Sequence, residues 1–456
     1  MTTFESSHIP EIPPGLIHKQ RDSQHLLLHP TRPRWAMTNQ LGREIIDLCD
    51  GHHTIASIAS ALARKYGQTQ ARVERDVVEF ITDLERARLL ASDSAECSES
   101  MPRSGISSVF LHVTDRCNLT CAHCYVDTHD SVELELSTQQ IHRLIDDLAC
   151  MGGTSVTFSG GEPLLRPDCL ELLRYAGEQL TVTLNTNATL IDSSVAGQLA
   201  SINPLVQVSV DGPDPETHDG IRGNGSFEAT MQGLRCLHAQ GLGPRLVIAT
   251  TLMKQNIARA PEMIDLATRL GVSRLRFLPL HRQGRAGSAW STLDASLDEY
   301  VEWFRYVYYD NEAQTCPVEI SGGLTGMAMY PSSNSETPWC SIGKTLVVDA
   351  HGNVYPCALM VDQRFLLGNV TQVGLEEITA SEQLRELTQT CRARKEKIET
   401  CRDCDWRNLC QGSCAALVFL EKGTLWAADS YCEFRRQLYE DLVFKMGKAR
   451  ARTQDS

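Results

Sequence analysis

The sequence predicts an α/β protein with three parts: a partial (β/α)6 TIM-like barrel, an N-terminal winged-helix domain and a C-terminal cysteine-rich domain. From Ser108 onward, short apolar segments alternate with amphipathic ones, which is typical of β-α units around a parallel sheet. A hairpin pattern and three amphipathic segments precede this region, and cysteines gather after residue 340. A chain of 456 residues is long enough for several such domains.

Composition and charge argue against two classes of main partner. The chain carries 43 basic and 57 acidic residues, a net charge of -14, which argues against nucleic acid or an acidic lipid surface. No apolar run is long enough to cross a membrane, and the first residues lack the pattern of a secretory signal. We therefore expect a cytoplasmic protein whose 17 cysteines include metal ligands and form no disulfide framework.

The N-terminal domain is predicted over residues 15–92. Apolar runs at residues 24–29 and 34–37 flank two prolines and predict a hairpin. Thr38 is expected to cap a helix that runs through Leu48. Thr54 starts a second helix that stops at Gly67, and a third helix follows from about Gln70. A hairpin with three short helices has the shape of a winged helix.

A winged helix first suggests DNA binding, but acidic residues balance the arginines of the third helix. The segment resembles the pyrroloquinoline-quinone peptide chaperone family, through residues 27–30, Leu41-Gly42, residues 48–51, Thr54-Ile55, Ile58 and Tyr66-Gly67. The resemblance implies that the leader of a ribosomal precursor peptide binds here as an added strand. The residues expected nearest that edge are Arg34, Trp35, Ala36 and Met37.

Residues 93–107 are polar and predict a linker, and residues 108–315 predict the barrel. Its strands are expected at residues 109–113, 155–158, 182–185, 206–210, 246–250 and 274–278. Six units cannot close an eight-unit barrel, so an open partial barrel is expected. Its active site should gather at the carboxyl ends of the strands.

Three cysteines follow the first barrel strand: Cys117, Cys121 and Cys124. Three thiolates can hold a [4Fe-4S] cluster and leave one iron for a ligand that is not protein. Zinc is an alternative, although its sites more often use two Cys-x-x-Cys pairs or added histidines. The motif resembles the signature of radical S-adenosylmethionine (SAM) enzymes, and the resemblance implies a cluster that binds and reductively cleaves SAM. The family often has an aromatic residue where this chain has His123.

Polar residues follow the next strands, where a ligand of the barrel would lie. Gly160, Gly161 and Glu162 come after the second strand and resemble the motif that holds the methionyl amino group in this family. Asn187 follows the third strand, and it alternatively satisfies only local backbone. Ser209 and Arg222 are, by the same resemblance, candidates to contact the ribose or the methionyl carboxylate, with Arg222 alternatively a surface charge.

Seven cysteines between residues 340 and 432 form a spaced pattern, and two zinc sites would also fit their spacing: Cys340, Cys357, Cys401, Cys404, Cys410, Cys414 and Cys432. The pattern resembles the auxiliary-cluster (SPASM) extension of peptide-modifying radical SAM enzymes. This resemblance implies a C-terminal iron-sulfur domain over residues 316–440, followed by a tail at 441–456. It assigns an outer [4Fe-4S] cluster to Cys401, Cys404, Cys410 and Cys432, and an inner one to Cys340, Cys357 and Cys414. Residues 434–448 predict a closing helix.

The inner cluster lacks a fourth ligand in this assignment. Some relatives supply a cysteine where this chain has Asn334, and Cys316 is the nearest upstream candidate. Without Cys316, the site would be open to a substrate thiolate. Ala358 replaces the aspartate that anaerobic sulfatase-maturing enzymes carry, which argues against formylglycine formation.

These resemblances together imply a radical SAM maturase that forms a thioether or carbon-carbon cross-link in a precursor peptide by 5'-deoxyadenosyl hydrogen abstraction. Flavodoxin or ferredoxin is the expected electron donor. Peptide decarboxylation and epimerisation stay open. One rival is an enzyme that acts on a tetrapyrrole side chain of the haem pathway, and another is a DNA-binding winged helix fused to a redox-sensing cluster module. The sequence identifies no catalytic side chain.

Overall fold

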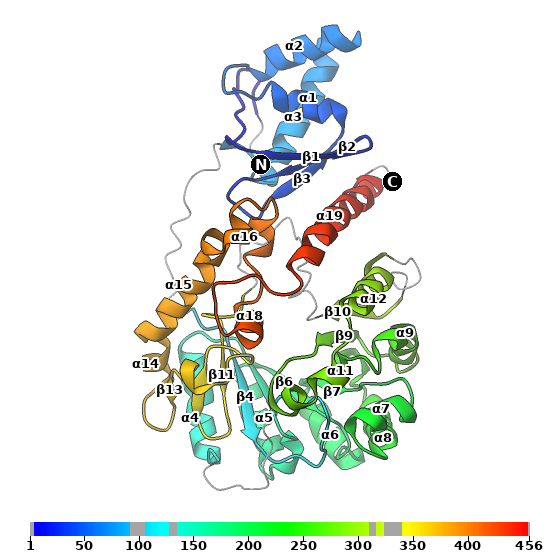
Figure 1. The fold of residues 1–456 in the computed structure, drawn as a ribbon, viewed down its shortest axis with the longest axis vertical. Coiled ribbons are helices and arrows are strands. Elements are labelled where there is room, and N and C mark those ends of the chain that lie inside the picture. The colour runs from blue at the N-terminus through cyan, green and yellow to red at the C-terminus, as the bar shows by residue number, and fades with distance from the viewer. Residues whose placement is uncertain (1–3, 92–104, 127–134, 310–315, 323–339, 455–456) are drawn as a thin grey trace.

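The computed structural model describes residues 4–91, 105–126, 135–309, 316–322 and 340–454. The described parts form an elongated molecule, with the N-terminal domain at one end and the barrel at the other (Figure 1). The C-terminal cysteine-rich region lies between them. The predicted linker at 93–107 falls outside the described residues except for its last three positions.

The N-terminal domain is a three-stranded antiparallel sheet followed by three helices. The strands β1 (Ile17–Arg21), β2 (Gln24–Leu28) and β3 (Trp35–Thr38) lie in sequence order. The helices are α1 (Gln40–Asp47), α2 (Ile55–Tyr66) and α3 (Gln70–Arg86). The expected hairpin is β2 and β3, while β1 was not predicted.

The helix boundaries test the capping predictions. Thr54 caps α2 by accepting from the N–H of Ser57, and Gly67 ends it in the left-handed conformation, as predicted. The predicted cap at Thr38 is wrong. Asn39 caps α1 by accepting from the N–H of Gly42, because Thr38 still pairs with β2 as the last residue of β3.

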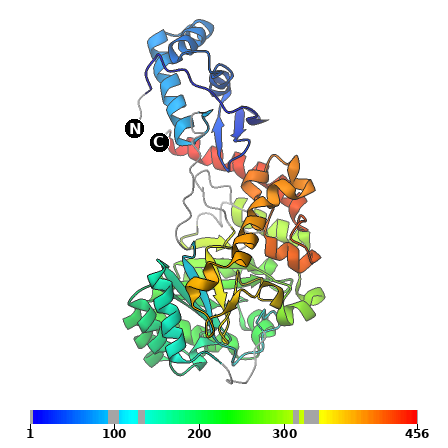
Figure 2. The same cartoon turned by 90° about the vertical axis from the view of Figure 1, so that its left-hand side faces the viewer.

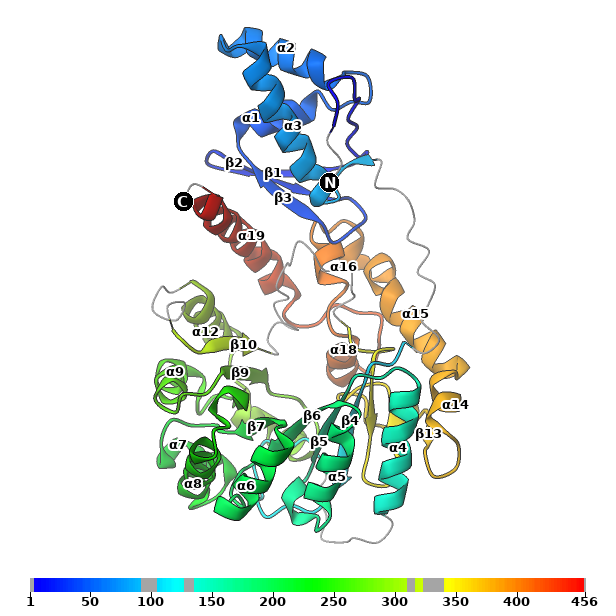
Figure 3. The same cartoon turned by 180° about the vertical axis from the view of Figure 1, so that it is seen from behind.

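The barrel contains six parallel strands in consecutive order, where the apolar segments predicted them. They are β4 (Ser108–Thr114), β5 (Ser155–Gly160), β6 (Thr181–Thr186), β7 (Leu205–Ser209), β8 (Leu246–Leu252) and β9 (Arg274–Pro279). Helices α4 (Thr138–Cys150), α5 (Cys169–Gly177) and α6 (Ser193–Ile202) lie side by side on the outer face (Figure 3). The chain continues through α7 (Pro215–Arg222), α8 (Ser226–Ala239), α9 (Ala260–Arg269) and α12 (Leu297–Tyr309).

Short strands extend the sheet at both edges. β10 (Glu319–Gly322) adds parallel to β9, and β11 (Thr345–Val348) adds parallel to β4. β12 (Asn353–Tyr355) and β13 (Gly368–Asn369) then continue antiparallel beyond β11. Both parallel additions come from the region after residue 315, so the sheet crosses the predicted boundary between the barrel and the iron-sulfur domain.

The cysteine-rich region is mostly helical after β13. Its helices are α14 (Leu375–Thr379), α15 (Glu382–Lys397), α16 (Glu399–Arg402), α17 (Arg407–Cys410), α18 (Ala415–Lys422) and α19 (Cys432–Gln454). The closing helix predicted at 434–448 lies inside α19, and so does the predicted start of the tail at residue 441. No helix in the described ranges combines the length and apolar character of a membrane span.

The N-terminal domain packs on the cysteine-rich region through one face of its sheet. Leu26, Leu28 and Trp35 form an apolar cluster with Trp406, Tyr439, Val443 and Phe444. We call these seven residues the docking cluster. Figure 2 shows α19 lying directly beneath the sheet. At its rim, Lys19 Nζ lies 2.7 Å from Asp405 Oδ2, and Arg21 Nη1 lies 2.7 Å from Asp441 Oδ1.

Candidate functional site

A cavity of about 520 Å³ lies inside the barrel. It is lined by Cys117, Cys121 and Cys124 and by all six predicted ligand-binding residues: Gly160, Gly161, Glu162, Asn187, Ser209 and Arg222. The lining also includes Ala358 and Leu359, which directly follow Cys357. The cavity therefore connects the three-cysteine loop after β4 with the cysteine-rich region.

Gly160, the last residue of β5, and Gly161, which follows it, allow the three-cysteine loop to pack closely. The N–H of Gly161 donates to the carbonyl of Thr114 at 2.8 Å, and the N–H of Glu162 donates to the carbonyl of Arg116 at 2.8 Å. A Cβ at Gly160 would lie 2.4 Å from the Thr114 oxygen, and one at Gly161 would lie 2.0 Å from the Arg116 oxygen. Both glycines therefore permit a close backbone approach just before Cys117.

Glu162 is 1% exposed, and its carboxylate is held in place by three donors. Oε2 accepts from the N–H of Asn187 at 2.8 Å, while Oε1 accepts from Thr186 Oγ1 at 2.8 Å and from the N–H of Leu164 at 3.2 Å. Burial raises the pKa of Glu162 above its usual value, and these donors partly oppose the shift. A carboxylate with room for a further donor suits an ammonium group.

The side chain of Asn187 joins β6 to the three-cysteine loop. Its Nδ2 donates to Asn118 Oδ1 at 2.9 Å, and its Oδ1 accepts from the N–H of Thr189 at 2.9 Å. The amide is thus committed to neighbouring protein groups. These contacts fit the alternative that the Asn187 side chain bonds to nearby protein groups, although Asn187 still lines the cavity.

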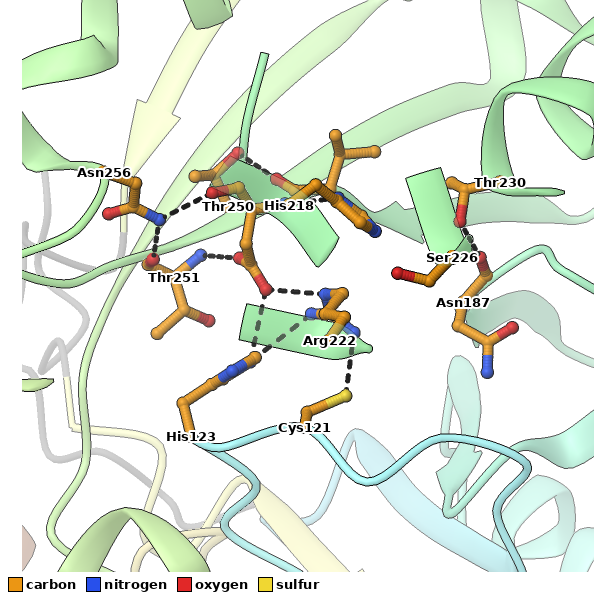
Figure 4. A network of polar contacts seen from close by, with 12 residues as sticks. Cys121, His123, Asn187, His218, Arg222, Ser226, Thr230, Thr250, Thr251 and Asn256 are labelled. Atoms are coloured by element: carbon orange, nitrogen blue, oxygen red, sulfur yellow. Dashed lines mark hydrogen bonds and ion pairs between the residues drawn. The ribbon is translucent and has the colours of Figure 1, made fainter. Parts of the chain in front are cut away.

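Polar contacts join Arg222 to His123 and Cys121 on the other side of the cavity (Figure 4). These contacts are organised by Asp211. It is fully buried, and its Oδ2 lies 2.6 Å from Arg222 Nε and 3.3 Å from His123 Nε2. Arg222 Nη1 in turn lies 3.7 Å from Cys121 Sγ. Burial by itself raises the pKa of Asp211, but Arg222, His123 and His218 together hold that pKa below its usual value. An ionised carboxylate therefore anchors a guanidinium beside a cysteine of the triplet.

Arg222 is 9% exposed and lies in this buried network, so it is not a surface charge. Asp211 is not among the site residues predicted from the sequence. The Asp-Gly pair directly after Val210 could have identified it, because an acidic residue at the carboxyl end of a barrel strand lies on the ligand side.

Two further groups of cysteines lie in the C-terminal region. The thiols of Cys404, Cys410 and Cys432 are electrostatic neighbours of Cys401, whose pKa burial raises to about 11. Cys340 and Cys414 are likewise neighbours of Cys357, whose pKa burial raises to about 12. The structure therefore brings together the same two sets of cysteines that the family resemblance assigned.

The residues present fit clusters better than single ions. Among the described residues, no three His, Cys, Asp or Glu side chains converge as closely as one metal ion requires. A cubane cluster takes each thiolate on a separate iron, so its ligands stand farther apart. Arg394 lies among these thiols and is 1% exposed, and its Nε and Nη1 have no hydrogen-bond partner within the described ranges. Those donors suit the sulfur atoms of a cluster.

Cys316 is not part of the inner set. It precedes β10, and its Sγ lies 3.4 Å from Thr268 Oγ1 on α9 and accepts from the N–H of Val318 at 3.4 Å. It packs against the barrel core, whereas Cys340, Cys357 and Cys414 pack in a separate apolar cluster. Asn334 lies outside the described residues.

Three family models match the chain. The model of the radical SAM superfamily matches residues 111–267, and that of an iron-sulfur cluster-binding domain (SPASM) matches residues 340–405. The model of coenzyme PQQ synthesis protein D matches residues 24–90. The matches fall on the barrel, the cysteine-rich region and the N-terminal domain.

Among curated proteins, mycofactocin maturase MftC of Mycobacterium tuberculosis is 32% identical over 333 residues, which cover 70% of this chain and 81% of the relative. AdoMet-dependent heme synthase of Methanosarcina barkeri is 29% identical over 346 residues, covering 71% of this chain and 95% of the relative. Among solved structures, Streptococcus suis SuiB bound to precursor peptide SuiA has a TM-score of 0.61 at 16% identity. That match covers 93% of this chain and 100% of SuiB, so the two share a fold.

Proposed function

Because this chain belongs to the radical SAM superfamily and carries SPASM and PqqD-like domains, we propose that it is a maturase that modifies a ribosomally synthesised precursor peptide. Its cofactors are SAM and [4Fe-4S] clusters. When bound, they supply a 5'-deoxyadenosyl radical that abstracts hydrogen from the substrate. The proposed product is a thioether or carbon-carbon cross-link in the peptide.

The observation that carries the proposal is that one chain joins a radical SAM barrel to a PqqD-like domain, which packs on the cysteine-rich region through the docking cluster. A relative named as a maturase, mycofactocin maturase MftC, supports a maturation reaction. SuiB was solved with its precursor peptide, and its fold matches 93% of this chain. A barrel enzyme acting on a free small molecule has no evident use for such a domain.

In this proposal, Cys117, Cys121 and Cys124 hold the cluster that binds SAM. The carboxylate of Glu162 receives the methionyl ammonium, since it lines the cavity with capacity for another donor. Gly160 and Gly161 set the loop position, and Asn187 braces it through Asn118. Ser209 and Arg222 contact the ribose or carboxylate, and Arg222 adds positive charge beside Cys121.

The C-terminal thiols hold the two auxiliary clusters. Cys401, Cys404, Cys410 and Cys432 bind the outer one, and Cys340, Cys357 and Cys414 contribute to the inner one. Because Ala358 and Leu359 line the cavity, the inner cluster would stand close to the substrate. An external flavodoxin or ferredoxin provides the electron, and the cytoplasm keeps the thiols reduced.

The leader peptide is proposed to add to β3, which pairs with β2 on one side and forms an edge of the three-stranded sheet. Arg34 and Trp35 are buried, with 6% and 2% exposure, so the exposed contacts of the edge come from its backbone and from Ala36 and Met37. A hollow of about 650 Å³ lies among helices α1, α2 and α3, next to the end of β3. It is lined by Leu41, Leu62, Tyr66, Arg72 and Val73, among others. It suits an apolar side chain of the leader.

The test is anaerobic reconstitution with reductant, SAM and the short peptides encoded beside the gene. The expected result is a peptide whose mass is lower by the hydrogen atoms removed in cross-linking, together with deoxyadenosine. Tyr66→Ala is expected to weaken leader binding by about tenfold through loss of apolar contact in the hollow. Leu190→Ala is the matched control, because Leu190 is 37% exposed on the barrel. Unchanged leader affinity in Tyr66→Ala would contradict the proposed binding position.

A tetrapyrrole side chain is the second candidate substrate. Haem-synthase relatives match over most of their length, and Arg274 and Arg276 on β9 both line the cavity. Guanidinium groups there suit the carboxylates of a porphyrin. Decarboxylation of an iron porphyrin in the same assay, without any peptide product, would favour this candidate over the maturase.

A further inference from the structure

A fourth thiol lies beside the three inner auxiliary cysteines. The thiol of Cys391, on α15, is an electrostatic neighbour of the Cys340 thiol. It also packs on the same apolar cluster as Cys340, Cys357 and Cys414, a cluster centred on Ile342, Met360, Leu387, Ala415 and Ala416. We propose that Cys391 is the fourth protein ligand of the inner auxiliary cluster.

The helix itself directs Cys391 inward. Leu384, Leu387, Arg394 and Ile398 are the buried residues of this segment, and Cys391 falls on the same face at the spacing of helical turns. Arg385, Glu386 and Arg392 occupy the exposed face. The position of the thiol is therefore fixed by the packing of α15 and needs no loop to close over the site.

Arg394 lies three residues farther along this face and supports the same assignment. Its Nη2 donates to the carbonyls of Gly412 at 2.6 Å and Ala427 at 3.2 Å. Its Nε and Nη1 have no partner among the described groups, although the side chain is an electrostatic neighbour of Cys391, Cys414 and Cys401. A buried guanidinium with two remaining N–H groups suits the negative charge and sulfur acceptors of a cluster held partly by Cys391.

Ligation by Cys391 closes the inner cluster with four protein thiolates. The Cys391 thiol would give up its proton to solvent on binding iron, as every thiolate ligand does. A substrate thiolate would then have no vacant iron there, so the cluster would no longer favour a thioether over a carbon-carbon product. The inference concerns cluster assembly and holds for either proposed substrate.

The first experiment uses the full chain with Cys117, Cys121 and Cys124 replaced by alanine, so that only auxiliary clusters form. In this background, Cys391→Ala is expected to lose about one of the four inner irons and to show the EPR signal of a [3Fe-4S] cluster after mild oxidation. Cys316→Ala is the matched control and is expected to keep the parental iron content and spectrum. Parental iron content and spectrum in Cys391→Ala would overturn the proposal, as would iron loss confined to Cys316→Ala.

A second measurement uses the unmodified chain and does not depend on how a variant folds. Under anaerobic alkylation, Cys391 is expected to resist labelling in the cluster-loaded protein and to react after iron is chelated. Cys150, which is exposed, serves as the reference and should react in both states. Equal labelling of Cys391 before and after chelation would overturn the assignment.

Discussion

Asp211 Oδ2 lies 2.6 Å from Arg222 Nε in a buried pair, and Arg222 extends from that pair to the thiol of Cys121. Asp211→Asn keeps the shape but leaves the guanidinium without its counter-charge. We expect a loss of about 3–5 kcal/mol in unfolding free energy. SAM affinity, measured by equilibrium dialysis, should also fall because Arg222 is no longer held in place.

Asp214→Asn is the matched control for that prediction. Asp214 pairs with Arg259 at 2.8 Å, but each side chain is 37% exposed. Solvent screens such a pair, so the same substitution should cost about 0–1 kcal/mol. Equal losses of unfolding free energy in the two variants would contradict the prediction that burial makes the Asp211 pair more stabilising than the exposed pair.

Gly161→Ala should displace the three-cysteine loop, because the new Cβ would lie 2.0 Å from the Arg116 oxygen. Overpacking of this kind costs about 1–3 kcal/mol or more. The expected readout is lower iron content of the SAM-binding cluster with the auxiliary clusters intact. Gly197→Ala, in α6 with open space around its Cα, should instead gain about 0.5–1 kcal/mol and retain full iron.

Trp406→Ala should loosen the N-terminal domain. Trp406 is 4% exposed in the docking cluster, so its removal should cost about 3–5 kcal/mol at this interface. Limited proteolysis should release the N-terminal domain earlier, and leader-dependent activity should fall. Trp426→Ala removes a tryptophan that is 42% exposed, and release at the parental rate is expected.

His112 predicts a loss of stability in acid. Burial lowers its pKa to about 4 from an ordinary value of 6.5. Between these values the unfolded chain binds a proton at His112 that the folded chain does not. The contribution of His112 to the free energy of unfolding is therefore constant above pH 6.5 and falls as the pH drops toward 4. For one such group the full loss is up to about 3 kcal/mol. In anaerobic urea unfolding at several pH values, His112→Phe should flatten this slope.

Periodic patterns predicted what local sequence controls. The six barrel strands are apolar segments between turns, and α2 has both a capping threonine and a terminal glycine, so these elements appeared where expected. β10 and β11 are four residues each and depend on pairing with distant strands, β9 for β10 and β4 for β11. The local sequence contains no signal for these pairings. β1 lacked an apolar pattern because its partly buried positions include Lys19 and Arg21, which pair with Asp405 and Asp441.

The same distinction explains the site residues. Cys117, Cys121 and Cys124 are close in sequence, so their spacing alone revealed them. Cys391 belongs to no spaced motif. Its thiol lies near Cys340 only because α15 packs on the same apolar cluster as the inner cysteines. A helical signal did exist: Leu384, Leu387 and Cys391 share one face of the segment.

The docking cluster has a consequence for engineering chimeric enzymes. Trp406 and Cys410 both pack at this cluster, so the surface that receives the N-terminal domain is continuous with the loop that carries outer-set thiols. A foreign recognition module spliced in before the barrel would meet a surface shaped for Leu26, Leu28 and Trp35. The exchangeable unit is therefore discontinuous in sequence and includes the Trp406 loop and α19. Swaps that ignore this would separate peptide capture from catalysis even when every domain folds.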